Sequence, residues 1–246
     1  QALNLMLEKY REKVQCCYID PPYNTQGDGF IYKDNFKHSS WLSFLSSRQY
    51  LSRQFISNNG LKIVSISDHE ISNLKQILDL IFQSNNFLGM VEWNSTKSVT
   101  NTALLSVGHT HNLIYAKQLD YFKENRYHFR LPDSIEGFSN PDNDSRGPWK
   151  ADPFQVEGER PNQRYEIKNP NTGQIYLPNS GCSWKNDYGN YQRLIKENRI
   201  IFGVGGESGP QRKRFWSEAK ERGKVPKSWW DDIETTSNGT SLLNNI

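Results

Sequence analysis

One carboxylate, two prolines and an aromatic ring follow one another at Asp20-Pro21-Pro22-Tyr23. The carboxylate and the Pro21 carbonyl can both accept hydrogen bonds from an amino group, and the Tyr23 ring offers a flat face to a base. The exocyclic amine of a purine is a poor nucleophile, and two acceptors that hold its hydrogens favour a more tetrahedral nitrogen. With that nitrogen in line with an activated methyl group, the turn could promote methyl transfer. The simpler alternative is an ordinary turn between a strand and a loop.

The turn is positioned by the short apolar run at residues 14–19, which predicts a buried strand of a parallel sheet. Two consecutive prolines end this strand because they cannot donate to a sheet ladder. Ligands of open α/β sheets bind beyond the carboxyl ends of the strands, so we expect chemistry at Asp20. A base that reaches this place must leave its duplex, and stacking on Tyr23 would offset part of that cost. The polar loop of residues 24–37 is expected to shape the site.

The hydrophobic periodicity predicts alternating helices and strands up to residue 117. A helix is expected within residues 1–13. A second helix is expected to be capped by Ser39 or Ser40 and stopped by Asn58-Asn59-Gly60, and a third to follow a capping box at residues 67–70. Strands are expected at residues 61–66, 87–93 and 111–117. Strand, helix, strand, helix, strand is the pattern of a doubly wound α/β sheet.

The composition describes the class of protein but does not name a partner. The hydrophobic fraction of 35% is low, and the net charge of +3 is too weak to indicate a partner. Three cysteines, two of them adjacent in an apolar run, do not make a disulfide framework. No apolar run reaches the ~18 residues of a membrane span, and no signal peptide opens the chain. We expect a soluble, cytoplasmic protein with no membrane partner.

From residue 118 the periodicity fades and Pro, Gly, Asn and aromatic residues accumulate. This predicts a loop-rich region at residues 118–230, which is folded because its aromatic side chains favour burial: Trp149, Trp184, Tyr188 and Tyr191. Residues 211–227 carry seven Lys and Arg and two Glu, a net +5, with Phe215 and Trp216 interleaved. Such a stretch suits a phosphate backbone, and its candidate DNA contacts are Arg212, Lys213, Arg214 and Lys227. The alternative is a solvated helix face.

Two further patterns are weaker. The glycine-rich run at residues 202–206 resembles a cofactor loop, but no clear apolar helix follows it, so we expect a turn. His109 and His111 share one face of the predicted strand edge, and no third ligand lies near them in the sequence. We therefore expect no metal site.

Several segments closely resemble the amino-methylating DNA methyltransferases, and more specifically the modification subunits of type III restriction-modification systems. The resemblance covers nearly the whole chain. Its motifs are CYIDPPYNT at 17–25, FIYKDNF at 30–36, HSSWL at 38–42, ISD at 66–68, HNLIYAK at 111–117, NPDND at 140–144, RGPW at 146–149 and VPK at 225–227. An Asp at the head of the tetrapeptide is similar to enzymes that act on adenine N6, whereas enzymes for cytosine N4 more often begin with Ser.

The resemblance implies a Rossmann-like methyltransferase sheet, incomplete in this chain, with a loop-rich α+β target-recognition insertion. Residues 1–117 would be the catalytic part, with Asp20, Pro21, Pro22 and Tyr23 as catalytic residues, and 118–230 the target-recognition region. The implied methyl donor is S-adenosyl-L-methionine, with Asp20 as a cofactor contact. The implied substrate is double-stranded DNA with a flipped adenine, and the resemblance allows a homodimer and a restriction subunit as protein partners.

In this subclass a Phe-x-Gly-x-Gly cofactor loop follows the recognition region. Residues 231–246 would then begin the segment that leads to that cofactor-binding half, and we expect the 246-residue chain alone to transfer no methyl group. Two other interpretations stay open. One is a cytosine-N4 methyltransferase, since the same grip serves either amine. The other is a non-catalytic DNA-binding fragment that lacks its cofactor half.

Overall fold

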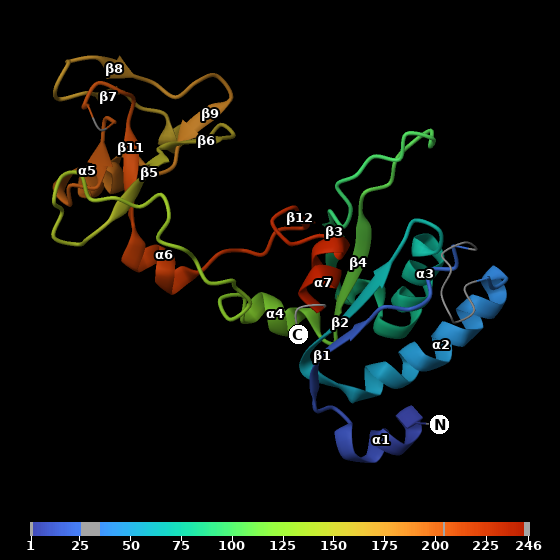
Figure 1. Cartoon of the computed structure of the whole chain (residues 1–246). Coiled ribbons are helices and arrows are strands. Elements are labelled where there is room, and N and C mark those ends of the chain that lie inside the picture. Colours follow the sequence, from blue (N-terminus) through green and yellow to red (C-terminus); the bar gives the residue numbers. More distant parts are fainter. Residues whose placement is uncertain (1, 26–34, 204, 244–246) are drawn as a thin grey trace. The chain divides into compact units, whose positions relative to one another are not determined.

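The computed structural model describes residues 2–25, 35–203 and 205–243 (Figure 1). The chain forms two compact units, the first from residues 1–129 and 226–246 and the second from residues 130–225. The predicted boundaries at 117/118 and 230/231 therefore shift, because residues 118–129 and 226–230 belong to the first unit. Most of the polar loop at 24–37, including most of the FIYKDNF motif, lies outside the described residues.

A five-stranded sheet forms the centre of the first unit. Its order is β1 (Val14–Ile19), β2 (Ile56–Ile66), β4 (Thr110–Ala116), β3 (Phe87–Trp93) and β12 (Trp229–Trp230). β1 pairs with β2 and β12 with β3 in parallel, whereas β4 is antiparallel to both of its neighbours. In Figure 1 the late strand β12, coloured red, accordingly lies beside β3. The predicted α/β class is confirmed, but the sheet is mixed rather than wholly parallel.

β1 is half-exposed, and the prediction of a buried strand is wrong. Among the described strands, β1 lies at the edge of the sheet, and its residue Tyr18 is 56% exposed. At the start of this strand pair, β2 passes close to the β1 backbone at Gly60. A Cβ atom added there would lie 2.8 Å from the Val14 carbonyl oxygen, so the position accepts only glycine.

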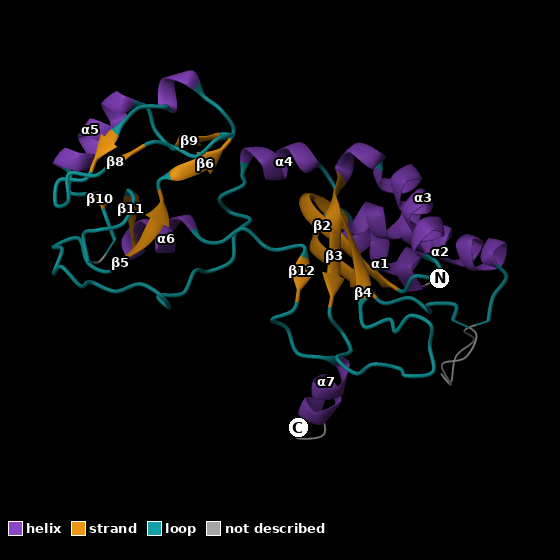
Figure 2. Ribbon diagram, turned by 90° about the horizontal axis from the view of Figure 1, so that it is seen from above, coloured by secondary structure: helices purple, strands orange, loops and turns teal. Residues whose placement is uncertain are grey.

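Helices α2 (His38–Phe55) and α3 (Ile71–Phe82) lie on one face of the sheet (Figure 2). Between them and the sheet is the main core, formed by Trp41, Leu45, Ile56, Val64, Ile66, Leu74, Leu78, Phe82, Leu113 and Tyr115. Helix α1 (Ala2–Tyr10) is the helix expected within residues 1–13, and it contacts α2. The shorter elements are η1 (Ser84–Asn86), α4 (Leu119–Glu124) and α7 (Thr236–Leu243).

The predicted helix caps are wrong. Neither α2 nor α3 has a side-chain cap at its start, and α2 begins one residue before Ser39. The predicted stop at residues 58–60 lies inside β2, because α2 passes directly into that strand at Ile56. Two residues of the expected capping box, Asp68 and Glu70, make tertiary contacts instead.

The second unit consists of short strands around a small core. β10 (Ile200–Ile201), β11 (Gln211–Phe215) and β5 (Trp149–Pro153) form an antiparallel sheet. The remaining elements are β6 (Gln155–Glu157) with β9 (Cys182–Trp184), β7 (Ile167–Lys168) with β8 (Ile175–Tyr176), η2 (Pro161–Gln163), α5 (Tyr188–Lys196) and α6 (Trp216–Arg222). Of the four aromatic residues expected to be buried, three are, while Tyr188 is 51% exposed.

The glycine-rich run and the lengths of the helices bear on two expectations drawn from the sequence. The glycine-rich run at 202–206 forms a turn, in which the Gly206 N–H donates to the Gly203 carbonyl over 3.2 Å. Both of these glycines have positive φ angles. Among the described residues, no helix is long and apolar enough to cross a membrane.

Candidate active site

The Asp20-Pro21-Pro22-Tyr23 turn leaves the carboxyl end of β1, as its sequence predicts. Asp20 is exposed, whereas Pro21 is buried. The indole N–H of Trp41, a fully buried residue of α2, donates to the Pro22 carbonyl oxygen over 2.8 Å. The turn is thus rigid at its prolines and tied to the core from below, while the carboxylate faces solvent.

Tyr23 is held between the turn and the neighbouring strand. Its ring packs against the main core, and its hydroxyl lies 2.9 Å from the Ser65 hydroxyl on β2. Burial raises the pKa of Tyr23 well above its ordinary value, the bond to Ser65 lowers it, and the nearby Asp20 carboxylate raises it again. Tyr23 therefore stays protonated at neutral pH.

Asn24 fixes the exit of the turn. It is buried with a positive φ of 62°, which asparagine tolerates better than most residues. Its side chain accepts a hydrogen bond from the Phe36 N–H (2.7 Å) and donates to the Phe36 carbonyl (3.0 Å). Asn24 and Phe36 are therefore held together beside the Asp20-Pro21-Pro22-Tyr23 turn.

Glu70 supports this clamp from beneath. The residue is fully buried, and its carboxylate accepts hydrogen bonds from the amides of Asn24 (2.6 Å) and Asn73 (2.7 Å). Its Oε1 also lies 2.7 Å from the Nδ1 atom of His38, at the start of α2. The sequence showed Glu70 only as the end of an expected capping box, and its real partners are up to 46 residues away.

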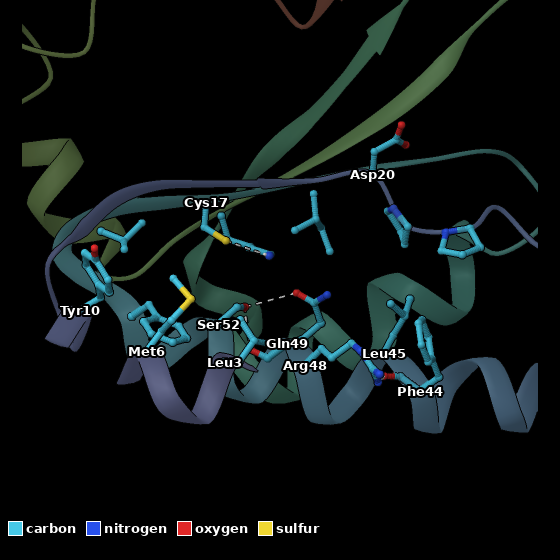
Figure 3. A pocket seen from close by; sticks show the side chains of 16 residues that line it. Leu3, Met6, Tyr10, Cys17, Asp20, Phe44, Leu45, Arg48, Gln49 and Ser52 are labelled. Atoms are coloured by element: carbon cyan, nitrogen blue, oxygen red, sulfur yellow. Dashed lines mark hydrogen bonds between the residues drawn. The ribbon is translucent and has the colours of Figure 1, made fainter. Parts of the chain in front are cut away.

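A cavity of about 510 Å³ lies between α1, α2 and β1 (Figure 3). Its lining is mainly apolar, and it includes Lys62, which is fully buried with its Nζ atom 3.3 Å from the Cys17 sulfur. Burial lowers the pKa of Lys62. The carboxylate of Asp20, at one end of the cavity, points away from it in Figure 3. The exposed carboxylate and the apolar cavity are thus on different sides of the turn.

The predicted DNA contacts lie on both faces of β11 and in the first compact unit. Arg212 and Arg214 share one face of β11, where both are half-buried. Their Nε atoms are buried with no hydrogen-bond partner among the described residues. The cationic groups of Arg214 and Lys150 lie 5.8 Å and 4.7 Å from the centre of the Phe138 ring. Lys227 is exposed but belongs to the other compact unit.

Lys213 is a correction to the predicted set. It points to the opposite face of β11 and is fully buried. Its ammonium group pairs with the carboxylates of Asp142 and Asp144 (3.0 Å to the latter). The hydrogen bond from Lys213 holds the pKa of Asp142 below its usual range, and that from Arg146 does the same for Asp144. A buried ammonium with two carboxylate partners is not offered to a phosphate group, so Lys213 is removed from the proposed DNA contacts.

The same residues explain the Asn-Pro-Asp-Asn-Asp segment. Asp142 also accepts a hydrogen bond from the Trp149 indole (2.8 Å), and Asn140 bonds the backbone of Asp144 through both ends of its amide. This polar cluster of Asp142, Asp144 and Lys213 joins the loop to β5 and β11. Its role in the fold is structural.

With this geometry in place, comparison with known proteins identifies the family. A model of the N6/N4 DNA methylase family, described as DNA methylase, matches residues 14–242. The chain belongs to this DNA methylase family. The resemblance seen in the sequence is confirmed, including its likeness to modification subunits.

Curated relatives of the chain include a subunit of a restriction-modification enzyme and a type II methyltransferase. The type III restriction-modification enzyme StyLTI Mod subunit of Salmonella typhimurium is 27% identical over 97% of this chain and 40% of that protein. The type II methyltransferase M.KpnI of Klebsiella pneumoniae is 31% identical over 67% of this chain and 42% of that protein. The chain thus spans about two fifths of the length of these relatives.

Among solved structures, the chain is similar to the PvuII DNA methyltransferase, a cytosine-N4-specific enzyme. The two are 14% identical with a TM-score of 0.35, over 48% of this chain and 47% of that one. A likeness of this degree carries no argument about the target base.

Proposed function

We propose that this chain carries the catalytic and target-recognition parts of a DNA methyltransferase that acts on the N6 amine of adenine. The methyl donor would be S-adenosylmethionine, and the protein would be the modification component of a restriction-modification system in the cytoplasm. The observation that carries the proposal is the exposed Asp20 carboxylate at the end of β1, on a turn fixed by Trp41 and Asn24. Family membership supports the same reaction class.

In this proposal Asp20 and the Pro21 carbonyl accept the two hydrogens of the target amine. This contact favours a tetrahedral nitrogen and stabilises the positive charge that develops as the new N–C bond forms. The methylated amine would then give up one proton to the Asp20 carboxylate, which would pass it to solvent because Asp20 is exposed. We assign the Pro22 carbonyl no part in this contact, because it accepts the indole N–H of the buried Trp41 on the core side of the turn.

Tyr23 would hold the flipped base. Its hydroxyl is fixed by Ser65, so a base would stack on the part of the half-buried ring that remains accessible. Because the ring is already ordered, little conformational entropy is lost when the base arrives. Asn24 and Glu70 act indirectly by holding the turn.

The described residues fit one contact of the methyl donor. Asp20 presents an exposed carboxylate, which suits a cationic group, and it faces away from the apolar cavity. When bound, S-adenosylmethionine would supply an electrophilic methyl group on a positively charged sulfur, and the broken S–C bond would leave the neutral thioether S-adenosylhomocysteine. The apolar cavity offers few partners for a ribose or an amino-acid group, so we do not place the donor there.

The DNA contacts that we propose are Arg212 and Arg214 in the second unit and, independently of them, Lys227 in the first unit. Two half-buried guanidinium groups on one strand face, with Lys150 beside them, suit the phosphate backbone. The names of the relatives, Mod subunits of restriction-modification enzymes, support a restriction subunit as a further partner. A second copy of the protein is the other partner that we propose.

The test is the chemical identity of the product. The longest natural form of the protein is incubated with labelled S-adenosylmethionine and mixed-sequence DNA, which is then hydrolysed to nucleosides and separated by mass spectrometry. The proposal predicts label in N6-methyldeoxyadenosine. Label in N4-methyldeoxycytidine instead would establish the alternative target base, and DNA binding without either product would establish a non-catalytic binding protein.

A further inference from the structure

Three side chains converge where β2 ends and β4 begins. Because β2 and β4 are antiparallel, with Ile66 opposite His111, the residues after β2 meet those that open β4. Asp68 Oδ1 lies 2.7 Å from the Nε2 atom of His111 and 3.8 Å from the Nε2 atom of His109. The ligand atoms of these three residues all lie within 4.8 Å of one another. The third ligand that the sequence did not show is thus Asp68, 41 residues or more before the two histidines.

The distances suit a metal ion. Two imidazole nitrogens and a carboxylate oxygen are a common ligand set for zinc, with bonds of roughly 2.0–2.2 Å, which place tetrahedral ligand atoms about 3.3 Å apart. The observed separations of 2.7 Å and 3.8 Å lie on either side of that value. Small side-chain rotations would therefore complete the geometry.

A second carboxylate orients one of the rings. The Nδ1 atom of His111 lies 2.6 Å from Glu92 Oε2, on the neighbouring strand β3. A metal-binding histidine commonly gives its other ring nitrogen to a carboxylate, which fixes the tautomer and increases the basicity of the ligating nitrogen. In His111, Nδ1 lies beside Glu92 and Nε2 lies beside Asp68. The His111 Nδ1 and Glu92 Oε2 atoms are both buried without a hydrogen-bond partner in the present ring orientation, so a small rotation of the ring would form this contact.

The charges and the exposure of the cluster favour a cation. Among the ion pairs of the described residues, Asp68 and Glu92 pair only with histidines. With neutral imidazoles the cluster carries two negative charges, which a divalent cation would balance. The Asp68 side chain is 51% exposed and that of His109 is 34% exposed, whereas that of His111 is 10% exposed. An ion can thus enter from solvent, and water can take a remaining coordination position.

We propose that Asp68, His109 and His111 form a binding site for a divalent transition-metal ion of the zinc type, with Glu92 orienting His111. The site joins the end of β2 to the start of β4 and does not depend on the proposed methyl transfer. The competing arrangement is a proton shared between His111 and Asp68, which would explain their 2.7 Å contact but gives His109 no role.

The experiment uses the purified chain after treatment with a chelator. Zn²⁺ is added in a calorimetric titration, and Co²⁺ serves as a spectroscopic probe of coordination geometry. We expect about one Zn²⁺ per chain, a tetrahedral Co²⁺ spectrum and a melting temperature raised by several degrees at about 100-fold excess of Zn²⁺ over Kd.

A variant at His109, the more exposed of the two histidine ligands, and a conservative variant at Glu92 keep the test independent of folding. His109→Ala should weaken Zn²⁺ binding by at least 10- to 100-fold, with an unchanged melting temperature in the absence of metal. Glu92→Gln should weaken it by roughly 10- to 100-fold through the orientation of His111. His128→Ala, at an exposed histidine outside the cluster, is the matched control and should bind as the parent chain does.

Two results would overturn the proposal. One is that the parent chain takes up neither ion. The other is that His109→Ala and Asp68→Asn bind Zn²⁺ as tightly as the parent, which would assign the uptake to other groups.

Discussion

The acidic turn after β1 and the basic strand β11 both carry charged residues, but the charged side chains differ in their exposure to solvent. At the turn, Asp20 is exposed while its neighbours Pro22 and Asn24 are fixed by buried partners. Along β11, side chains alternate, so that Lys213 is buried between two half-exposed arginines. A turn can present a single group whatever surrounds it, whereas a strand sends consecutive like charges to opposite faces with different functions.

The largest expected effect comes from the buried side of β11. Lys213→Ala leaves the carboxylates of Asp142 and Asp144 without their shared cation. Because Asp142 is 41% exposed and can recover some solvation, we expect a loss of about 2–3 kcal/mol, less than for a wholly buried pair. The measurement is the free energy of unfolding of the chain in urea. Hydrogen exchange of the amides in β5 and β11 then shows whether the loss is local to these strands.

The control lies next to it in the sequence. Arg212→Ala should change the free energy of unfolding by less than about 1 kcal/mol, since the arginine is half-exposed and makes no ion pair among those found for the described residues. If Lys213→Ala and Arg212→Ala lower the free energy of unfolding equally, the proposed difference in function between the two faces of β11 is contradicted.

At the acidic turn, removal of the Tyr23 ring should act on transfer. Base stacking is worth ~1–3 kcal/mol, so Tyr23→Ala should lower kcat/KM for methyl transfer by roughly 5- to 150-fold. Tyr23→Phe keeps the ring and loses only the bond to Ser65, and it should lose much less activity. Equal losses in the two variants would make the hydroxyl, not the ring, the important group.

The half-exposed face of β11 should affect DNA binding rather than stability. Arg212→Gln with Arg214→Gln should weaken binding to unrelated duplexes and reduce the log–log salt slope by about one for each lost phosphate contact. The matched control is Arg193→Gln with Lys196→Gln, which removes the same charge from exposed positions of α5 in the same unit. An unchanged salt slope in the β11 variant would show that these arginines form a solvated face and do not contact phosphate groups.

A smaller effect is expected in acid. The pKa values of Asp142 and Asp144 are lowered in the folded chain, so the folded state binds protons more weakly than the unfolded state. Their contribution to stability is complete above the unfolded carboxyl pKa of about 3.9 and is lost as pH falls through the lower folded values. The protection factors of the amides in β5 and β11, which are corrected for the intrinsic effect of pH on exchange, should therefore fall selectively below about pH 4. Asp142→Asn should show a weaker dependence on pH.

Local patterns predicted the elements and the turn, while long-range partners decided the rest. The apolar run at residues 87–93 became β3 with the same bounds, and the two prolines ended β1 at the expected residue. The capping box failed because Asp68 contacts His111 and Glu70 contacts Asn24, residues 43 and 46 positions away. Lys213 looked like its neighbours because its two carboxylate partners lie 71 and 69 residues earlier. No pattern in a single sequence reports such pairings.

The most direct test of the catalytic turn is methyl transfer by Asp20→Ala in the longest natural form of the protein, at saturating S-adenosylmethionine. Loss of an acceptor that acts in the transition state should lower kcat by about 100-fold or more, with duplex affinity retained. Asp120→Ala, at an exposed carboxylate on α4, should keep its full activity as the matched control. Near-normal turnover of Asp20→Ala would contradict the proposed grip on the target amine.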